Sequence, residues 1–436
     1  MTPPAGGSAR HPDPEGRVAE GDETLFLSRA LATDAVHSRP ACLPNDAPLH
    51  ESAATEVNIL LLVEGNAETR DSWSGVALSV VQSFREAGHS VRPRDVDLHG
   101  PRRFAVAMRT PSASSRRWRI RYRLGPAGFE ARSRLARQAV REEIDKADVV
   151  LQVGATFQAE VPPSKPLFLY CDSNIQFARA GIDSGYSEAS ALTPPEMDEI
   201  RAREAEVYQR ATTIFTMSDR LRRSFSEDFG VPAEKRCTGH CGPGAAPDAL
   251  GPIQWEGKRP TVLFVGRDFR RKGGDILLEA FQRVRESVEG ARLVMIGGKP
   301  AVPFTGDVEY LGYLNRDAPQ DRARMEAAFR EASVFCLPTR YDAFGTSFVE
   351  AMFHGLPCVG PDAWAVPEAV VHDQTGYLVA PEDPTALAEA LERLLADPEL
   401  ATRMGRAGLK RAHERFSWPV LIGRMIERMR TAIVSN

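Results

Sequence analysis

Short, continuous apolar runs alternate with amphipathic stretches along most of the chain. The first run, at residues 57–63, reads Val-Asn-Ile-Leu-Leu-Leu-Val, and an amphipathic stretch at 76–87 follows it and stops at Gly88. A short apolar run is typical of a strand buried on both faces, and a 3.6-residue apolar period is typical of a helix. This part of the chain is therefore predicted to form a strand, a loop and a helix.

The same alternation continues to about residue 217 and begins again after residue 260. In the first series we predict further strands at 91–96, 147–153, 166–171 and 212–217, with helices at about 130–146 and 196–210. In the second series we predict strands at 261–265, 292–296, 308–311, 333–337 and 358–360, with helices at 275–287, 321–332, 347–354 and 417–433. Such alternation predicts an α/β protein with two parallel sheets, each covered by helices on both faces. Two doubly wound domains that face each other are expected to bind ligands in a central cleft at the carboxyl ends of their strands.

Changes in composition predict the domain boundaries. Residues 1–54 lack periodicity and are rich in Pro, Gly, Ala and acidic residues, so we interpret them as a disordered tail. The Gly/Pro-rich stretch 242–260 separates the two series. We predict Rossmann-like domains at 55–245 and 246–416, and a C-terminal helix at 417–436 that packs back toward the first domain.

Composition and charge narrow the class of protein. Of the 436 residues, 42% are hydrophobic and 26% are charged, which is typical of a soluble globular protein. The net charge of -4 gives no general attraction to nucleic acid. Neither a secretory leader nor the roughly 18-residue apolar run of a membrane span is found, so we expect a cytoplasmic protein.

One small cluster of metal-binding residue types needs an explanation. Cys237, His240 and Cys241 lie within five residues, but the second ligand pair of a zinc site is not visible nearby. We therefore interpret them as a loop at a strand end and expect no metal there. The six cysteines of the chain are scattered, which suits a reducing compartment.

Arginine is concentrated in the segment 102–141. Its twelve arginines are at positions 102, 103, 109, 116, 117, 119, 121, 123, 132, 134, 137 and 141, and acidic residues are few. Two interpretations stay open: a solvated face of an arginine-rich protein, or a patch that contacts an anionic acceptor or the inner face of a membrane.

The strongest chemical signal lies in the second series. The strand at 261–265 runs into Gly266 and Arg267, and Lys272-Gly273-Gly274 opens the next helix. A glycine at the end of a strand lets a ligand approach the backbone, and two cations five residues apart can bind one diphosphate. Two exposed cations of a loop are the alternative interpretation.

A second signal follows the strand at 333–337. The loop carries Asp342 and Gly345, and a helix starts near Thr346 with Glu350 about one turn inside it. The start of a helix offers free N–H groups and a positive dipole end, which suit an anion. A carboxylate there can accept hydrogen bonds from sugar hydroxyls, although a glutamate near the start of a helix is also common without any ligand.

These residues resemble the pattern of the family 4 glycosyltransferases, retaining enzymes with the GT-B fold. The matching motifs, in order and spacing, are Gly266-Arg267, Lys272-Gly273, Asp342, Glu350-Ala351-Met352, Gly355-Leu356-Pro357 and Asp373-Gln374-Thr375-Gly376. The resemblance covers about residues 57–433. It implies transfer of a hexosyl group from a nucleotide-diphosphate sugar to an acceptor, with retention of the anomeric configuration.

The resemblance also implies a role for each matching residue. Arg267 and Lys272 would bind the donor diphosphate, Glu350 would bind the ribose hydroxyls, and Asp342 would face the transferred sugar. These four residues would be the catalytic residues. Other implied donor contacts are the backbone of Gly75, Gly266, Phe344, Gly345 and Thr346, with Tyr313 and Leu314 beside the base. Asp172 would lie on the acceptor side.

The chain departs from the family pattern at three points. Asp342 stands where glutamate is commoner, Ser74 replaces the first glycine of a Gly-Gly loop, and histidine is missing between His99 and His240. A non-catalytic sugar-nucleotide or glycan-binding protein and a sugar-nucleotide epimerase therefore stay open as alternatives. Because the cleft residues of the second series carry no Asp-x-Asp pair, we expect a metal-independent reaction that needs no cofactor. The expected partners are the donor and a sugar, lipid-linked or small-molecule acceptor.

Overall fold

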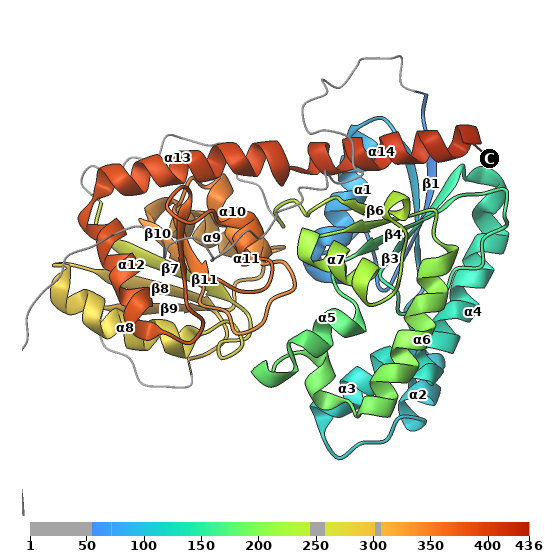
Figure 1. The fold of residues 1–436 in the computed structure, drawn as a ribbon, viewed down its shortest axis with the longest axis horizontal. Coiled ribbons are helices and arrows are strands. Elements are labelled where there is room, and N and C mark those ends of the chain that lie inside the picture. Colours follow the sequence, from blue (N-terminus) through green and yellow to red (C-terminus); the bar gives the residue numbers. More distant parts are fainter. Residues whose placement is uncertain (1–54, 71, 245–257, 301–306, 436) are drawn as a thin grey trace, which may run out of the picture. The chain divides into compact units, whose positions relative to one another are not determined.

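The computed structural model describes residues 55–70, 72–244, 258–300 and 307–435 (Figure 1). The tail predicted at 1–54 and most of the linker predicted at 242–260 lie outside the described residues.

Six parallel strands form the first sheet, in the spatial order β2-β1-β3-β4-β5-β6. Their bounds are β1 Asn58–Val63, β2 Ser90–Asp95, β3 Val149–Val153, β4 Leu167–Cys171, β5 Thr213–Thr216 and β6 Arg236–Thr238. The five predicted strands of this series are confirmed. The sixth, β6, is too short to show a pattern of its own in the sequence.

The second sheet is also all parallel, in the order β12-β11-β10-β7-β8-β9. Its strands are β7 Thr261–Gly266, β8 Arg292–Gly297, β9 Val308–Gly312, β10 Val334–Cys336, β11 Cys358–Pro361 and β12 Gly376–Val379. The five predicted strands are again confirmed, and β12 was not predicted. Crossovers between parallel strands place the ends of β7 and β10 side by side, and this juxtaposition matters for the candidate site.

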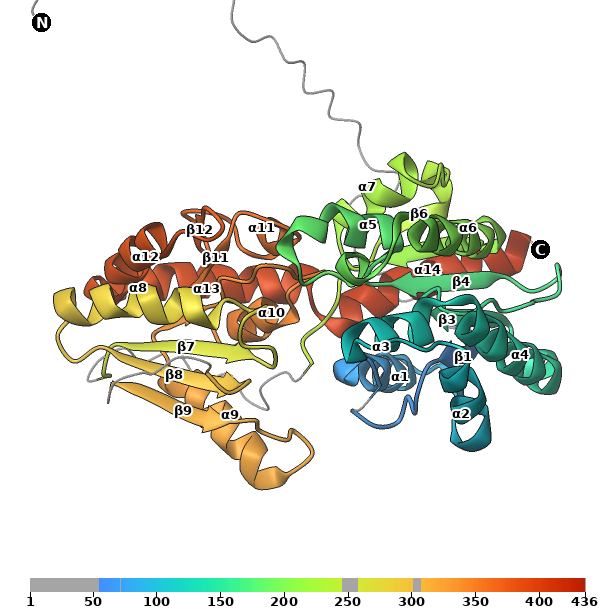
Figure 2. The same cartoon turned by 90° about the horizontal axis from the view of Figure 1, so that it is seen from below.

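Helices lie in most of the connections of both sheets, and the connection between β3 and β4 has none (Figure 2). In the first half they are α1 Val76–Glu86, α2 Gly100–Met108, α3 Ser115–Leu124, α4 Pro126–Glu143, α5 Ile175–Ala180, α6 Pro194–Arg210 and α7 Asp219–Glu227. In the second half they are α8 Gly274–Ser287, α9 Pro319–Glu331, α10 Thr346–Phe353, α11 Val366–Ala369, α12 Pro384–Ala396, α13 Pro398–Arg415 and α14 Trp418–Ser435. The predicted helices are present, whereas α2, α3, α5, α7, α11, α12 and α13 were not predicted.

Both faces of the first sheet are buried, which explains its continuous apolar runs. In β1, Ile59, Leu61 and Val63 belong to the core that includes α1, while Leu60 and Leu62 belong to a second cluster with residues of α4 and α6. Successive side chains of a strand point to opposite faces. A strand that is covered by helices on both faces therefore needs an apolar residue at nearly every position.

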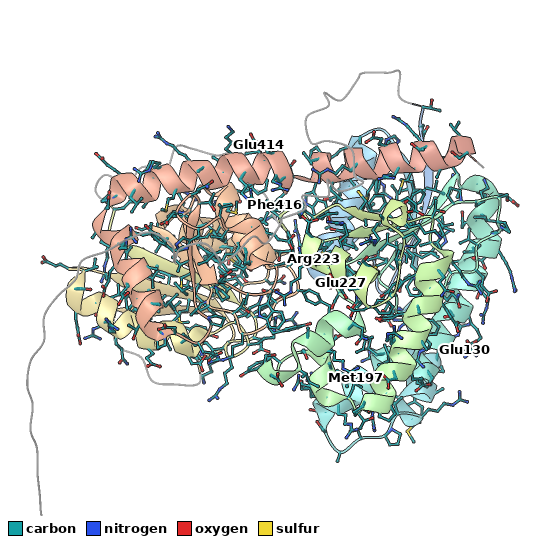
Figure 3. All side chains as sticks on the ribbon, viewed as in Figure 1. Glu130, Met197, Arg223, Glu227, Glu414 and Phe416 are labelled. Atoms are coloured by element: carbon teal, nitrogen blue, oxygen red, sulfur yellow. The ribbon has the colours of Figure 1, made fainter. Side chains whose placement is uncertain are left out.

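The last helix, α14, returns to the first sheet. Its buried residues are Leu421, Ile422, Met425, Ile426 and Met429, and it contacts α1. Arg424 donates to the carbonyl of Thr238 at 3.4 Å, and Arg430 donates to that of Thr55 at 3.1 Å. Phe416 lies between α13 and α14 (Figure 3). The domain boundaries that we predicted stay predictions.

In the described ranges, every helix is too short or too polar to cross a membrane.

Candidate functional site

Two loops at the carboxyl edge of the second sheet are locked together. β7 and β10 are neighbours, so the loop after Gly266 lies beside the loop that leads to α10. Arg271 donates to the carbonyl of Tyr341 at 2.9 Å, and the N–H of Arg340 donates to the carbonyl of Arg271 at 2.9 Å. Gly273 has φ +75°, and a Cβ there would lie 1.9 Å from the carbonyl oxygen of Pro338. Only glycine lets the two loops approach this closely.

Lys272 and Asp342 form an ion pair across these two loops. Each side chain is only 12% exposed. Burial lowers the pKa of Lys272, and the carboxylate of Asp342 opposes that shift. The sequence placed both residues at the site but did not predict their contact. An ammonium group has three N–H donors, so Lys272 can hold Asp342 and still donate to a phosphate.

Arg267 follows the last residue of β7 and is exposed. Its guanidinium lies 5.6 Å from the centre of the Tyr313 ring, a cation–π distance. The Tyr313 side chain is 63% exposed, whereas Leu314 is buried in the core. Of the two residues expected beside the base, Tyr313 therefore presents an accessible ring next to an arginine.

Glu350 is 4% exposed, and its carboxylate is held on three sides. Nη1 of Arg316 donates to Oε1 and Nη2 donates to Oε2, both at 2.7 Å, while the N–H of Gly244 donates to Oε1 at 3.1 Å. The charge of Glu350 raises the pKa of Arg316. Arg316 was not among the predicted site residues. It follows Gly312 by four residues, in the loop already expected beside the base, but its partner is 34 positions away.

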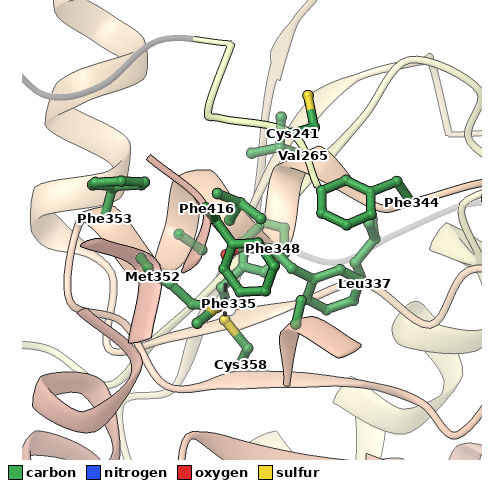
Figure 4. Close-up of a cluster of buried hydrophobic side chains, with 14 of the residues drawn as sticks. Cys241, Val265, Phe335, Leu337, Phe344, Phe348, Met352, Phe353, Cys358 and Phe416 are labelled. Carbon is green, nitrogen blue, oxygen red and sulfur yellow. Dashed lines mark hydrogen bonds between the residues drawn. The ribbon is translucent and has the colours of Figure 1, made fainter. Parts of the chain in front are cut away.

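The start of α10 has the features of an anion-binding site. Gly345 has φ +82° and precedes the first helical residue, Thr346. Phe344 and Phe348 are buried beneath it, in the cluster shown in Figure 4. This packing fixes the backbone that carries the free N–H groups of the first turn. The predicted donor contacts at Phe344, Gly345 and Thr346 are therefore backbone positions at the start of a helix.

His240 lies near this helix start, although no role at the site was predicted for it. Its ring is 6.3 Å from that of Phe344 and 5.0 Å from that of Phe416. Burial lowers its pKa to about 4, so the imidazole is neutral near pH 7. Cys237 lies in β6, and His240 and Cys241 lie in the loop after it, as expected of a strand end.

Gly75 and Asp172 lie at the carboxyl edge of the first sheet. Gly75 has φ +88° at the start of α1, and Asp172 follows the last residue of β4. Burial raises the pKa of Asp172, and the charge of Arg123 opposes that shift. Arg70, five residues before Gly75, donates to the carbonyl of Gly244 at 2.8 Å and lies 3.4 Å from Asp317. The loop before α1 is thus joined to the loop that carries Arg316.

Several arginines of the segment 102–141 make specific contacts within the protein. Arg116 donates to Ser187 and Ser190, Arg117 and Arg121 contact Glu196, and Arg123 contacts Glu188. Arg132 is 1% exposed and contacts Glu64 and Asp97. Much of the segment is therefore tied to its own half of the chain by ion pairs, so it is not one uniform basic patch.

Comparisons with known proteins agree with these motifs. Residues 259–397 match the family described as Glycosyl transferases group 1. A GDP-mannose-dependent alpha-(1-6)-phosphatidylinositol monomannoside mannosyltransferase of Mycobacterium tuberculosis is 29% identical over 188 residues, which cover 40% of this chain and 48% of that protein. A D-inositol 3-phosphate glycosyltransferase of Xylanimonas cellulosilytica is 33% identical over 176 residues, which cover 38% of this chain and 41% of that protein. The chain spans about half the length, or less, of these relatives.

Solved structures share the architecture of most of the chain. A sucrose-phosphate synthase of Thermosynechococcus elongatus aligns with a TM-score of 0.61 and 19% identity, over 87% of this chain and 100% of that one. A glycosyltransferase of Rickettsia africae aligns with a TM-score of 0.59 and 14% identity, over 88% and 100%. The predicted GT-B fold is confirmed, as is the resemblance to the family 4 glycosyltransferases that the motifs carry.

Proposed function

From the family 4 resemblance, we propose that the protein is a retaining glycosyltransferase, which transfers a hexosyl group from a nucleotide-diphosphate sugar to a hydroxyl acceptor. One observation supports this most directly: Arg267 and the Lys272–Asp342 pair lie on two loops of a single sheet edge, and Glu350 lies in α10, the helix that follows the second loop. Ligands of doubly wound sheets bind at this edge. The first turn of α10 adds N–H donors to the same place.

In the proposed reaction, charge grows on the leaving diphosphate as the bond from the anomeric carbon to the phosphate oxygen breaks. Arg267, Lys272 and the N–H groups of α10 stabilise that charge because they are held in place before the reaction starts. Asp342 faces the sugar, beside the developing positive charge, and its side chain is held there by its contact with Lys272. The acceptor oxygen forms the new bond on the same face and gives its proton to the leaving phosphate.

We propose that fixed cations, without a divalent metal, neutralise the diphosphate. Arg267 and Lys272 supply two positive charges, and Arg316 balances the negative charge of Glu350. The enzyme is then expected to keep its turnover in excess EDTA. Loss of turnover that manganese restores would contradict this part of the proposal.

The acceptor is proposed to be a polyhydroxylated sugar, lipid-linked or small molecule. The two relatives named above act, by their names, on a phosphatidylinositol mannoside and on an inositol phosphate. For this chain we propose a cytoplasmic enzyme whose first half contacts an anionic acceptor or the inner face of a membrane through the segment 102–141.

Within that segment, helix α2 fits a membrane surface better than α3 or α4. Phe104 and Met108 are 68% and 66% exposed and lie one turn apart, opposite the buried Val106. Arg102, Arg103 and Arg109 are exposed beside them. A short helix with apolar residues on its outer face and arginines around them can insert shallowly into an anionic lipid surface.

Sedimentation with lipid vesicles tests this membrane contact. The parent protein should bind vesicles that contain phosphatidylglycerol, and the variant Phe104→Ser/Met108→Ser should bind them at least tenfold less, because insertion depends on apolar area. The control Arg283→Glu/Arg403→Glu/Arg406→Glu changes three exposed arginines of the second half. If both variants bind as the parent does, α2 is not a membrane contact.

The transfer reaction itself is tested with a panel of UDP-, GDP- and ADP-sugars. A donor at 100 times its dissociation constant should stabilise the protein by about 2.7 kcal/mol in a thermal-shift assay. Slow release of sugar with the α configuration retained would support the transferase. Inversion of the sugar within the nucleotide would instead identify an epimerase, and tight binding without turnover would identify a binding protein.

A further inference from the structure

The carboxylate of Glu350 has little hydrogen-bonding capacity left. An ionised carboxylate offers about four lone-pair positions. Two of them, on Oε1, face the Arg316 fork and the N–H of Gly244, and one on Oε2 faces the other branch of the fork. Among the residues that the structure describes, none faces the second position on Oε2, so a single acceptor position is open there.

The loop that carries Arg316 is anchored on both sides of this residue. Leu314 is buried in the core, and the N–H of Asn315 donates to Asp321 at 2.9 Å. On the other side, Asp317 lies 3.4 Å from Arg70. With its backbone held at these points, Arg316 keeps its planar fork in register with Glu350.

A bidentate arginine–carboxylate pair at this depth is costly to break. The Glu350 side chain is 6% exposed, so the loss of Arg316 would leave a buried charge without its partner. A ribose hydroxyl is a neutral donor and replaces a charged donor poorly. The incoming ribose is therefore expected to use the open position on Oε2 and to leave the fork in place.

We propose that Arg316 is a positioning residue that sets which ribose hydroxyl the enzyme recognises, a role that rests on the proposed binding of a nucleotide-diphosphate sugar. By occupying three positions of Glu350 together with Gly244, it leaves one acceptor for the two hydroxyls of the ribose. Glu350 then accepts from one hydroxyl only. An unpaired carboxylate could accept from both.

Binding of deoxynucleotides tests this directly. The probe is the ribonucleoside diphosphate (UDP, GDP or ADP) that gives the largest thermal shift, with its 2′-deoxy and 3′-deoxy analogues, measured by calorimetric titration. One analogue should bind about 10- to 150-fold more weakly than the ribonucleotide, the loss expected for one hydrogen bond to a charged group. The other analogue should bind like the ribonucleotide.

Variants of Arg316 should change which of the two deoxy analogues bind more weakly than the ribonucleotide. A variant of a residue with only a structural role would not change this. In Arg316→Met, Glu350 regains acceptor positions, so both analogues should bind at least about tenfold more weakly than the ribonucleotide. Arg316→Lys keeps the charge without the fork, and its discrimination should fall between the two. Arg292→Met is the control, because it removes an arginine paired with Glu309 and Glu331 away from the site.

The outcomes separate this inference from the proposed function. If the parent binds none of the nucleotides, the donor site itself is wrong. If the parent binds the ribonucleotide but both analogues lose affinity equally, the ribose has displaced Arg316 and the inference fails. It also fails if Arg316→Met, with a melting temperature near that of the parent, keeps the parent's pattern. The double variant Arg316→Met/Glu350→Ala should lose all discrimination, which would show that the effect acts through Glu350.

Discussion

The two sheets share a parallel topology, but their carboxyl edges use charge differently. At the first edge, Glu64 and Asp97 both form ion pairs with Arg132, a residue of α4 that is 1% exposed. At the second edge, Arg267 is exposed. Lys272 pairs with the carboxylate of Asp342 and has further N–H donors for a ligand. The same architecture thus carries a closed charge cluster in one half and an open one in the other.

This difference separates a structural use of charge from a binding use. A buried pair whose hydrogen-bonding capacity is filled within the protein contributes to folding, and breaking it leaves an unpaired charge. A cation that retains donors at the edge of a sheet can stabilise an anionic ligand. Four experiments can sharpen or break this distinction.

The largest effect is expected at the two cations of the second edge. Arg267→Ala and Lys272→Ala should each lower kcat/KM by roughly 10²–10³, the scale seen when one charge-stabilising donor is removed. Arg132→Ala should instead lower the free energy of unfolding by about 3–5 kcal/mol, as for other broken buried pairs. Steady-state kinetics and chemical unfolding measure both. Parent-like kinetics in Arg267→Ala and Lys272→Ala would break the comparison.

Substitutions of the two carboxylates at the second edge should have different effects on nucleotide binding. Glu350→Ala should weaken binding of the free nucleoside diphosphate by about 10- to 150-fold, since a hydrogen bond to a charged group is lost. Asp342→Ala should impair sugar transfer and leave nucleotide binding nearly unchanged, because the proposed partner of Asp342 is the sugar and not the nucleotide. Titration with the nucleoside diphosphate beside turnover assays gives both quantities. Equal losses of nucleotide affinity in the two variants would contradict the assignment.

A third effect concerns the contact that joins the two loops. Gly273→Ala places a methyl group against the carbonyl of Pro338 and should cost about 1–3 kcal/mol beyond the penalty for positive φ. Gly290→Ala is the matched control, with φ +73° and open space around its Cβ, and should cost about 1–2 kcal/mol. Equal losses in denaturant unfolding would show that the loops are not tightly packed.

A fourth effect is a pH dependence in the first half. Burial raises the pKa of Glu204 to about 8, so the native state keeps a proton that the unfolded chain releases near pH 4.5. Stability should therefore fall as pH rises from about 4.5 to 8, by at most about 1.4 kcal/mol per pH unit from this group. Glu204→Gln should remove that slope in denaturant titrations at pH 5.5, 6.5 and 7.5.

Glu196, on the same helix, provides the control for this experiment. Burial opposes the shift, but hydrogen bonds from Thr193 and Arg121 lower its pKa to about 2. Its contribution is lost only as pH falls toward 2, so Glu196→Gln should leave the slope between pH 5.5 and 7.5 unchanged. If Glu204→Gln also leaves that slope unchanged, the buried carboxyl is ionised in the native state.

The sequence predicted the features that depend on local patterns. The strands β1, β3, β4, β7 and β8 lie in largely continuous apolar runs, whereas β2 reads Ser-Val-Arg-Pro-Arg-Asp. The residues of the second edge lie in short motifs with fixed spacing. Helix α3 could not be predicted in this way because it has no buried residue and therefore no apolar period. Strand β6, with three residues, is too short for any period.

Pairings between loops could not be read from the sequence. Arg316 meets Glu350 across 34 residues, and Lys272 meets Asp342 across 70. Both contacts depend on which strands are neighbours in the sheet, and the strand order is not encoded in any single motif. The arginine-rich segment shows the same limit, since composition did not reveal that Arg117 and Arg121 converge on Glu196.

The return of α14 to the first half has a consequence for synthesis of the protein. The face of α1 that α14 covers belongs to a helix that ends at Glu86, whereas α14 begins at Trp418. The last strand of the first sheet, β6, is made about 180 residues earlier than α14. At about 5–20 residues per second, roughly 10–40 seconds pass between the synthesis of β6 and that of α14, and the apolar face of α1 is uncovered throughout this time. The first half is therefore most exposed to aggregation while the second half is still being translated.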